Sequence, residues 1–279
     1  MTESVLPIVL LHVGTDDNAL DACLGALDTA TPAGTKIWLI DDAQAGPRGQ
    51  AVITHWLERT PLLAEYTRRT HPVGESRHIH EALKICGERD VVVLPSDAIP
   101  FEGWLQALKD CFDRDASIAT ATPWSNIGET ASWPRVDDLN PLPENPERLA
   151  RAVAVMPALH PELPSACAHT VLIRGKAYAR AGGVDEASFH SWPAALSDLS
   201  LRLSGLGWRN ALCETAFVAR IHEPNVDSED QDALIARWPA WHARVVQFLM
   251  DDPLKETRRQ VLQKLLNVDA QGPQPDLFV

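Results

Sequence analysis

Short apolar runs alternate with segments of helical periodicity along most of this chain, and this alternation limits the possible folds more than any other feature. The strand-like runs are at residues 7–13, 36–43, 66–71, 91–94, 168–173 and 216–221. The helical segments are at residues 18–27, 51–63, 77–86, 101–112, 174–181, 196–206, 238–250 and 254–266. Strands that alternate with helices form right-handed crossovers and a mostly parallel sheet. The sequence therefore predicts an α/β fold, with a central sheet flanked by helices and a C-terminal helical extension.

Acidic residues stand where two of these runs end. Asp41 and Asp42 follow one apolar run, and Asp97 follows another. The carboxyl ends of parallel strands share one edge of the sheet, where ligands bind in open α/β folds. Carboxylates there can accept hydrogen bonds from a nucleotide, or ligate a hard cation such as Mg²⁺ or Mn²⁺. The simpler alternative is that each acid only caps the following helix, but three acids at successive strand ends favour a binding role.

Charge and cysteine usage exclude several classes of function. The formal net charge of −13 argues against nucleic-acid binding, which needs clustered basic residues, and allows at most peripheral membrane contact. Five scattered cysteines with no CxxC pair favour free thiols in a reducing compartment, which predicts a cytoplasmic protein. The N-terminus lacks the basic start of a signal peptide, and no apolar run has spanning length. The dinucleotide fingerprint, the P-loop, the GxSxG elbow and HExxH are all absent.

The middle of the chain differs from the rest. Residues 122–164 are rich in Pro, Asn and Trp and show weak patterning. An irregular stretch of this length in a compact domain is usually a functional loop or lid. Trp124, Trp133 and Trp192 stand in loop-like sequence, and aromatic faces of this kind stack on sugars and bases. They are candidates for binding an acceptor, although most tryptophans are core residues.

Several segments, taken in order, resemble a family 2 glycosyltransferase with the GT-A fold. The matching segments are WLIDDAQ, GESRHIHEAL, VVVLPSDAIPFEGWL, ATPWSNIGETASWP, HTVLIRGKAYARAGGVDE, LSDLSLRLSGLGWR and VARIHE. The resemblance spans about Pro7 to Glu223. It implies a nucleotide-sugar-binding domain over residues 1–237, with a donor half at 1–121 and an acceptor half at 122–237. Residues 238–279 would then be C-terminal helices and a tail.

The resemblance also implies roles for particular residues. Asp41 or Asp42 would contact the nucleotide base. Asp97 would bind a divalent cation, or the ribose and phosphate of the donor. His222 would join the metal and pyrophosphate site. The implied cofactor is Mg²⁺ or Mn²⁺.

Two departures from the family pattern concern catalysis. Pro95-Ser96-Asp97 keeps only the last acid of a DxD motif. Ala195 and Leu196 stand where the family carries a Glu-Asp pair, whose second acid would deprotonate the acceptor. Asp198 is the remaining candidate for this base, with helix capping as its alternative role.

Other acids could replace the missing pair. Asp185, Glu186 and Glu129 are the candidates, and without any base the protein would not transfer sugar.

The expected function is transfer of a sugar from a UDP- or dTDP-linked donor to an acceptor hydroxyl, with inversion at the anomeric carbon. The acceptor would be a glycan, a lipid-linked sugar or a protein, in the synthesis of a surface polysaccharide or glycoconjugate. The rival is an inactive GT-A-fold protein that binds or scaffolds. A nucleotidyltransferase is disfavoured because HVGTDDNA is acidic rather than Gly-rich and basic. An apolar stripe in the C-terminal helices, Trp238, Trp241, Val245 and Phe248, would pack on the domain or form a homodimer surface.

Overall fold

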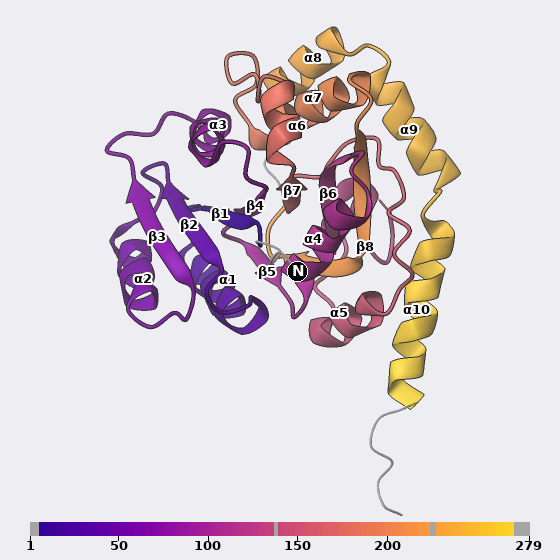
Figure 1. Ribbon diagram of the computed structural model, residues 1–279, viewed down its shortest axis with the longest axis horizontal. Helices are drawn as coiled ribbons and strands as arrows, with labels where there is room; N and C mark the ends of the chain where they lie inside the picture. Colours follow the sequence, from indigo (N-terminus) through magenta and orange to yellow (C-terminus); the bar gives the residue numbers. More distant parts are fainter. Residues whose placement is uncertain (1–5, 137–138, 224–226, 271–279) are drawn as a thin grey trace, which may run out of the picture.

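An eight-stranded sheet in the order β3-β2-β1-β4-β7-β6-β8-β5 organises the computed structural model, which describes residues 6–136, 139–223 and 227–270. The strands are β1 (Ile8–His12), β2 (Lys36–Asp41), β3 (Leu63–Arg68), β4 (Val91–Pro95), β5 (Ala98–Pro100), β6 (Ile118–Trp124), β7 (Val171–Ile173) and β8 (Arg209–Arg220). The helices are α1 (Asp17–Ala30), α2 (Pro47–Leu57), α3 (Glu75–Cys86), α4 (Trp104–Arg114), α5 (Pro146–Ala154), α6 (Gly175–Arg180), α7 (Trp192–Gly205), α8 (Ser228–Arg237), α9 (Trp241–Asp251) and α10 (Lys255–Ala270). A short 3₁₀ helix, η1, spans Glu129–Ala131. The predicted α/β architecture is confirmed (Figure 1).

Strand direction decides which residues meet at one edge of the sheet. β3, β2, β1 and β4 are parallel neighbours. β7 lies antiparallel between β4 and β6, and β6 is parallel to β8. β8 therefore runs in the same direction as β4, although most of the chain separates them. β5 follows β4 at once and pairs with β8, with Ala98 opposite Arg220. The carboxyl ends of β1, β2, β4 and β8 thus share one edge.

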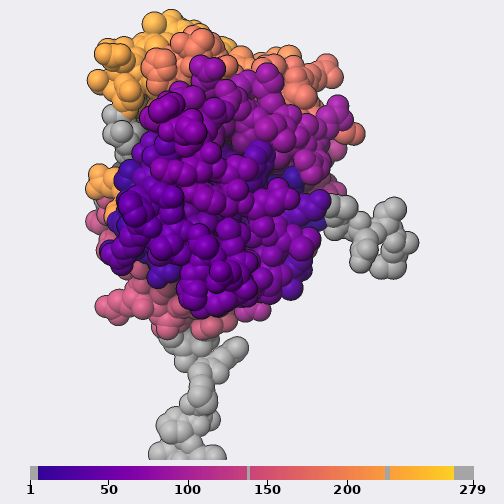
Figure 2. Space-filling model, turned by 90° about the vertical axis from the view of Figure 1, so that its left-hand side faces the viewer, coloured from indigo at the N-terminus to yellow at the C-terminus, as the bar shows by residue number. Residues whose placement is uncertain are grey.

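Helices cover both faces of the sheet, which explains why the central strands β1 and β4 are almost continuously apolar. In β1, Val9 and Leu11 face one core cluster, which α1, α2 and α4 complete. Ile8 and Leu10 face the other cluster, which α3, α6 and α7 complete. Figure 2 shows the N-terminal part of the chain, in indigo and purple, forming most of one side of the molecule. Salmon and orange segments of the C-terminal part lie above it.

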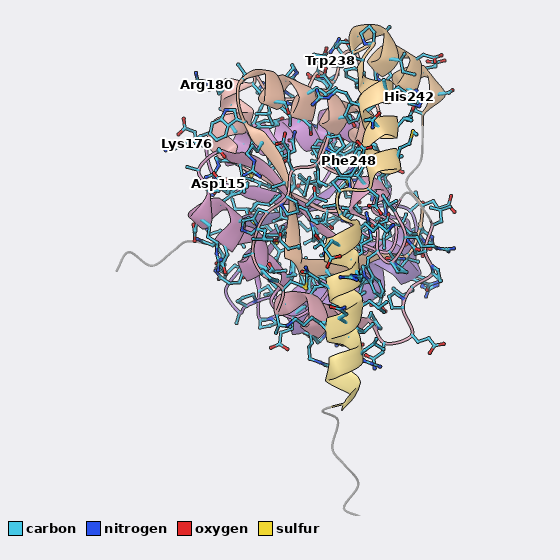
Figure 3. The ribbon with its side chains drawn as sticks, turned by 90° about the vertical axis from the view of Figure 1, so that its right-hand side faces the viewer. Asp115, Lys176, Arg180, Trp238, His242 and Phe248 are labelled. Atoms are coloured by element: carbon cyan, nitrogen blue, oxygen red, sulfur yellow. The ribbon has the colours of Figure 1, made fainter. Side chains whose placement is uncertain are left out.

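A third core cluster joins the C-terminal part of the chain to β6 and β8. It contains Trp124 and Phe217 from the strands, with Leu149 from α5 and Leu254 and Val261 from the α10 region. Helices α9 and α10 run along this side, where Figure 3 labels Trp238, His242 and Phe248.

The predicted apolar stripe of the C-terminal helices packs only partly. Trp238 and Trp241 lie against the second cluster, and Phe248 lies against the third. A homodimer through the rest of this stripe stays a prediction, as do the domain boundaries. Residues 271–279 of the predicted tail lie outside the described residues. Within the described chain, none of the helices combines the length and the hydrophobicity that crossing a bilayer requires.

The stretch predicted to be irregular contains regular elements. The first residues of this stretch, 122–124, form the end of β6. Helix α5 begins at Pro146, after Asn145, whose side chain accepts a hydrogen bond from the Arg148 N–H. The sequence pattern hid both elements, because β6 mixes threonine with apolar residues and α5 has only nine residues. The segment 125–133 is a compact turn, in which the Ser125 N–H donates to the Ala131 carbonyl and the Trp133 N–H donates to the Ser125 carbonyl.

Candidate functional site

Both acids at the end of β2 are buried and hold loops of the chain. The Oδ1 of Asp41 accepts from the N–H groups of Gln44 at 2.6 Å and Ala45 at 3.2 Å. Its Oδ2 accepts from the Tyr66 hydroxyl at 2.7 Å and from the Arg68 guanidinium. Asp41 therefore fixes the loop after β2 against β3, and its contact with a nucleotide base stays a prediction.

Asp42 organises the entry to α3. Its two oxygens accept from the N–H of Val73 at 2.9 and 3.0 Å, and its Oδ2 accepts from the N–H of Gly74 at 2.8 Å. Gly74 has a φ of 99°, which disfavours a side chain at the residue that precedes α3. Asp42 thus places the first turn of α3 beside the end of β1. Its own contact with a nucleotide also stays a prediction.

Asp97 meets the end of β8, as its place beside β5 requires. Its Oδ2 accepts from the Arg220 Nε at 3.0 Å and from the His222 N–H at 3.3 Å. The His222 Nε2 lies 2.9 Å from the Oδ2 of Asp16 in the loop after β1. The hydrogen bond from the Ala19 N–H, followed by that from His222, lowers the pKa of Asp16. We call Asp16, Asp97, Arg220 and His222 the β8-end cluster. The structure thus brings Asp97 and the backbone of His222 together, and their predicted role in a shared metal and pyrophosphate site stays a prediction.

Asn126 holds the backbone of Arg220 from the turn 125–133. The Asn126 Oδ1 accepts from the Arg220 N–H at 2.8 Å, and its Nδ2 donates to the Arg220 carbonyl at 3.0 Å. Asn126 is itself buried. Sequence reasoning missed Asn126, Arg220 and Asp16. The signal that was available is the Ser-Asn pair that follows the apolar strand in ATPWSN, because a buried amide at a strand end needs backbone partners.

Ser96 connects the loops after β1 and β4. Its hydroxyl oxygen accepts from the Gly14 N–H at 2.8 Å. A Cβ on Gly14 would lie 3.1 Å from this oxygen, so the close approach of the two loops favours glycine. Ser96, which occupies the middle of the degenerate DxD motif, therefore has a local structural partner.

The residues at this edge do not fit a divalent cation. Asp97 is the one acid that the motif keeps, and its Oδ2 accepts from the guanidinium of Arg220. The His222 Nε2 is engaged by Asp16. Across residues 6–136, 139–223 and 227–270, no group of three or more His, Cys, Asp or Glu side chains is arranged to hold a metal ion. A cation would also be repelled by the fixed charge of Arg220.

A cluster of buried polar side chains, the β1–α3 polar cluster, lies between the end of β1 and the start of α3. Three of its buried atoms lack a hydrogen-bond partner among the described residues, namely His12 Nε2, Ser76 Oγ and His78 Nδ1. The His12 and His78 rings are 5.9 Å apart in an edge-on arrangement. β1 pairs with β2 on one side and β4 on the other, which makes this the point where the strand order reverses. Ligands bind at such switch points in open α/β sheets.

Burial keeps two histidines neutral, which predicts a pH dependence of stability. Desolvation, followed by the charge of His12, lowers the pKa of His78 to about 4. Desolvation lowers the pKa of the fully buried His169 to about 3. An unfolded chain protonates these rings near pH 6.5. The stability gained from these neutral rings is therefore fully present above pH 6.5. It is lost as the pH falls from 6.5 towards the folded-state pKa values of the two histidines.

We expect the free energy of unfolding to fall between pH 6.5 and pH 4, by about 1.4 kcal/mol for each full unit of pKa depression. Urea titrations across this range measure the decline. His78→Asn should make the decline shallower, whereas His242→Asn, at an exposed position, should leave it unchanged. An equal slope in wild type and His78→Asn would contradict the assignment.

Asp198 lies inside the helical layer, between α7 and the end of α8. It is fully buried, and it accepts from Arg202 Nε at 2.8 Å, from Arg237 Nη1 at 3.2 Å and from the Trp238 indole at 2.9 Å. The carboxylate thus joins α7 to the end of α8. Its predicted role as a base stays a prediction, but its surroundings indicate packing, because a base must reach the acceptor hydroxyl.

The three tryptophans predicted to bind an acceptor are also buried. Trp124 and Trp133 belong to the third core cluster, and Trp192 belongs to the second. A buried ring offers no open face to a sugar, so this conformation gives all three a packing role. Acceptor binding by them stays a prediction.

The other acids considered as bases differ in their surroundings. Asp185 forms an ion pair with Arg237 at 2.8 Å, and Glu186 lies 3.8 Å from His80. Glu129, an exposed residue, lines a cavity of 330 Å³ between η1, the start of α7 and helices α8 and α9. The cavity is also lined by Ser191, Pro193, Ala194 and Ser197, around the position of the missing acid pair. Glu129 has a φ of 49°, an unfavourable value for a non-glycine residue that functional sites often carry.

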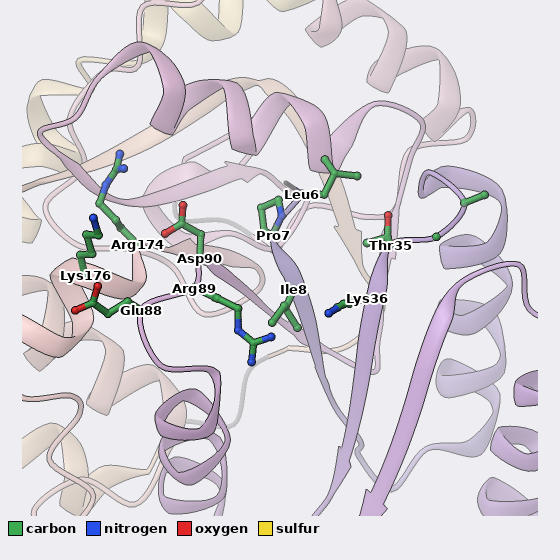
Figure 4. Close-up of a pocket in the computed structure, with 12 residues that line it drawn as sticks. Leu6, Pro7, Ile8, Thr35, Lys36, Glu88, Arg89, Asp90, Arg174 and Lys176 are labelled. Carbon is green, nitrogen blue, oxygen red and sulfur yellow. The ribbon is translucent and has the colours of Figure 1, made fainter. Parts of the chain in front are cut away.

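A cavity of 1030 Å³ opens at the other edge of the sheet (Figure 4). It is lined by Pro7, Lys36, Asp90 and Lys176, near the amino ends of β1, β2 and β4. Arg174 also lines it, but its guanidinium donates to the carbonyls of residues 112, 115 and 118. The cavity is therefore separate from the β8-end cluster and the β1–α3 polar cluster.

Comparisons with known proteins support the fold but no family. No protein-family model matches the chain, and no curated protein matches it either. Among solved structures, GalNAc-T7 with UDP, GalNAc and Mn²⁺ superposes with a TM-score of 0.65 at 13% identity. The match covers 98% of this chain and 59% of that one, so this chain spans less than two thirds of its length.

Two further structures are similar. The mannosyltransferase PcManGT from Pyrobaculum calidifontis, in complex with GDP-Man and Mn²⁺, has a TM-score of 0.56 at 12% identity, with 98% of this chain and 78% of that chain covered. S. aureus TarS has a TM-score of 0.54 at 11% identity, with 96% and 44% covered. At these identities the similarity establishes the fold, which is GT-A-like.

Proposed function

We propose that this chain is a glycosyltransferase that moves a sugar from a nucleotide-sugar donor to an acceptor hydroxyl. The observation that supports this most is the convergence of Asp97, Arg220 and His222 at one sheet edge, on a GT-A-like fold. The structurally similar proteins include ones solved with UDP or with GDP-Man.

The donor lies across the carboxyl edge of the sheet. Its base lies at the strand-order switch point beside the β1–α3 polar cluster, where His12, Ser76 and His78 have buried atoms without partners among the described residues. Its diphosphate lies at the β8-end cluster. A UDP- or dTDP-linked donor suits this position, because a pyrimidine ring presents both donors and acceptors at its edge. The neutral state of His78 favours pairing with an uncharged base.

The acceptor enters the 330 Å³ cavity, and Glu129 deprotonates its hydroxyl. Glu129 belongs to the same turn as Asn126, which holds Arg220, so one loop carries the base and supports the donor site. The acceptor oxygen attacks the anomeric carbon from the face opposite the diphosphate, and the configuration inverts. Positioning of the two substrates and stabilisation of the leaving diphosphate supply most of the rate enhancement. The acceptor is a glycan, a lipid-linked sugar or a protein in cytoplasmic glycoconjugate synthesis.

A binding or scaffolding role is the second candidate. The observation in its favour is that Asp198 is enclosed, while Ala195 and Leu196 replace the family's acid pair. Under this reading the nucleotide binds at the same edge, but no sugar is transferred.

The test measures release of nucleoside diphosphate from a panel of UDP-, dTDP- and GDP-sugars, with and without simple glycoside acceptors. We expect release from at least one donor. Glu129→Gln should lower the rate by about 100-fold or more, because general-base catalysis contributes 10²–10⁴-fold. Its affinity for UDP, measured by calorimetry, should stay within about two-fold of wild type, because the base does not contact the nucleotide.

Glu162→Gln is the matched control, because Glu162 is also an exposed glutamate of the segment 122–164. It should leave release unchanged. Nucleotide binding without release from any donor would favour the binding role, and full release by Glu129→Gln would exclude Glu129 as the base.

A further inference from the structure

We propose that Arg220 takes the place of a divalent cation at the donor diphosphate, so that this protein binds its nucleotide without metal. The inference rests on the proposed function, because it concerns the same site. It starts from the disagreement between the Mn²⁺ in two structurally similar proteins and the residues at this edge.

The first argument is the position of the guanidinium. The Arg220 Nε lies 3.0 Å from Asp97 Oδ2, where a cation held by the last acid of the motif would bind. The side chains of Asp97 and Arg220 are 12% and 13% exposed. At such burial the two opposite charges stabilise each other, and a divalent cation beside them would face an unfavourable like charge.

The second argument is the unused donor capacity of Arg220. A guanidinium has five N–H donors in a planar fork that matches phosphate oxygens. Only Nε donates to Asp97, and neither Nη nitrogen donates to a residue within the described part of the chain. Both remain available to bind two oxygens of a diphosphate. The salt bridge with Asp97 and the two Asn126 hydrogen bonds fix the direction of the fork.

The third argument concerns the neighbouring His222. Its side chain is half exposed, and Asp16 orients its imidazole through Nε2 at 2.9 Å. Asp97 is paired with the Arg220 guanidinium, and Asp16 accepts from the N–H groups of Asn18 and Ala19 and contacts His222, so the two carboxylates of the β8-end cluster are stabilised by the chain itself. No further cation is needed to reduce their repulsion of a diphosphate.

The experiment is calorimetric titration of UDP, and in parallel GDP and dTDP, into the full chain, once in excess EDTA and once in Mn²⁺. We expect wild-type Kd values in the two buffers to agree within about two-fold. Arg220→Gln should weaken binding in EDTA by 10-fold or more, which corresponds to at least 1.4 kcal/mol. Arg220→Lys should fall between wild type and Arg220→Gln, because a lysine keeps the charge but not the fork.

Arg209→Gln is the matched control. Arg209 stands at the other end of β8 and forms its own aspartate pair, with Asp115 at 2.6 Å. It should bind UDP like wild type. If Arg220→Gln does not fold, as judged by thermal unfolding, the double variant Asp97→Asn/Arg220→Gln replaces it, because a neutral amide pair leaves no buried charge unpaired.

The outcomes separate this inference from the proposed function. Nucleotide binding in Mn²⁺ but not in EDTA would overturn the inference and leave the function standing. Wild-type affinity of Arg220→Gln in EDTA would also overturn it. Failure of UDP, GDP and dTDP to bind in either buffer would overturn the proposed function itself, and the inference with it.

Discussion

Replacing Asp198 with alanine is expected to lower the free energy of unfolding by about 3 kcal/mol. The carboxylate is fully buried and accepts from two arginines and an indole. Removing one partner of a buried ion pair costs about 3–5 kcal/mol, because the remaining charge is left uncompensated. We expect the lower end of this range, since Arg202 and Arg237 are 26% and 35% exposed and can partly rehydrate. Urea unfolding measures the loss.

Asp198→Asn separates packing from catalysis. Asparagine keeps the shape and can accept from the Trp238 indole, but it loses both ion pairs. We expect reduced stability with UDP affinity and donor turnover per folded molecule close to wild type. Asp232→Asn on α8, at an exposed position, is the control and should change stability by less than about 0.5 kcal/mol. Unchanged stability with a large loss of turnover would return Asp198 to the role of base.

Arg258→Met is expected to cost about 3 kcal/mol of stability and to weaken UDP binding. Arg258 is buried in α10, and it donates to the carbonyls of Ser132 at 2.9 Å and Thr130 at 3.3 Å. Each buried carbonyl left without a partner costs about 1–3 kcal/mol. The same guanidinium lies over the Trp124 ring, 5.4 Å from its centroid. The variant therefore loosens the turn 125–133, which carries Asn126.

Arg259→Met is the control for this prediction, on the adjacent residue. Arg259 is 64% exposed and pairs with the exposed Glu256 at 3.0 Å. Exposed pairs contribute little, so we expect a change below about 1 kcal/mol and normal UDP binding. Thermal unfolding of both variants measures the change in stability, and calorimetry measures their UDP binding. Equal effects of the two substitutions would show that Arg258 does not anchor the turn.

The sequence predicted the sheet well, because buried strands read directly from apolar runs. It placed β1, β2, β4, α1 and α3 within three residues, whereas α2 (Pro47–Leu57) begins and ends several residues before the predicted helix at 51–63. It missed β6 and α5, where threonines and a short helix weaken the periodicity. The run 168–173 predicted the strand β7, but its antiparallel place between β4 and β6 was beyond prediction, because pairing partners depend on tertiary packing.

The candidate site was predictable only in part. The strand-end acids Asp41, Asp42 and Asp97 were visible, but which of them has a free oxygen depends on donors from distant segments. Tyr66 and the N–H of Val73 are examples. Arg220 gave no signal of its own, because one arginine at a strand end is common. Its importance follows from its position opposite Ala98, which only the β5–β8 pairing reveals.

The contacts of the β8-end cluster join residues that are far apart in the chain. The Asp97–Arg220 contact spans 123 positions and the Asp16–His222 contact spans 206. Forming contacts between residues so far apart in the sequence has a large entropic cost of loop closure, so such contacts tend to form slowly. During synthesis, the N-terminal strands can assemble long before Arg220 leaves the ribosome. A nascent chain that ends before β8 would therefore fold its first strands and still lack Arg220 and His222 of the proposed diphosphate site. Nucleotide binding would then report that β8 has joined the sheet.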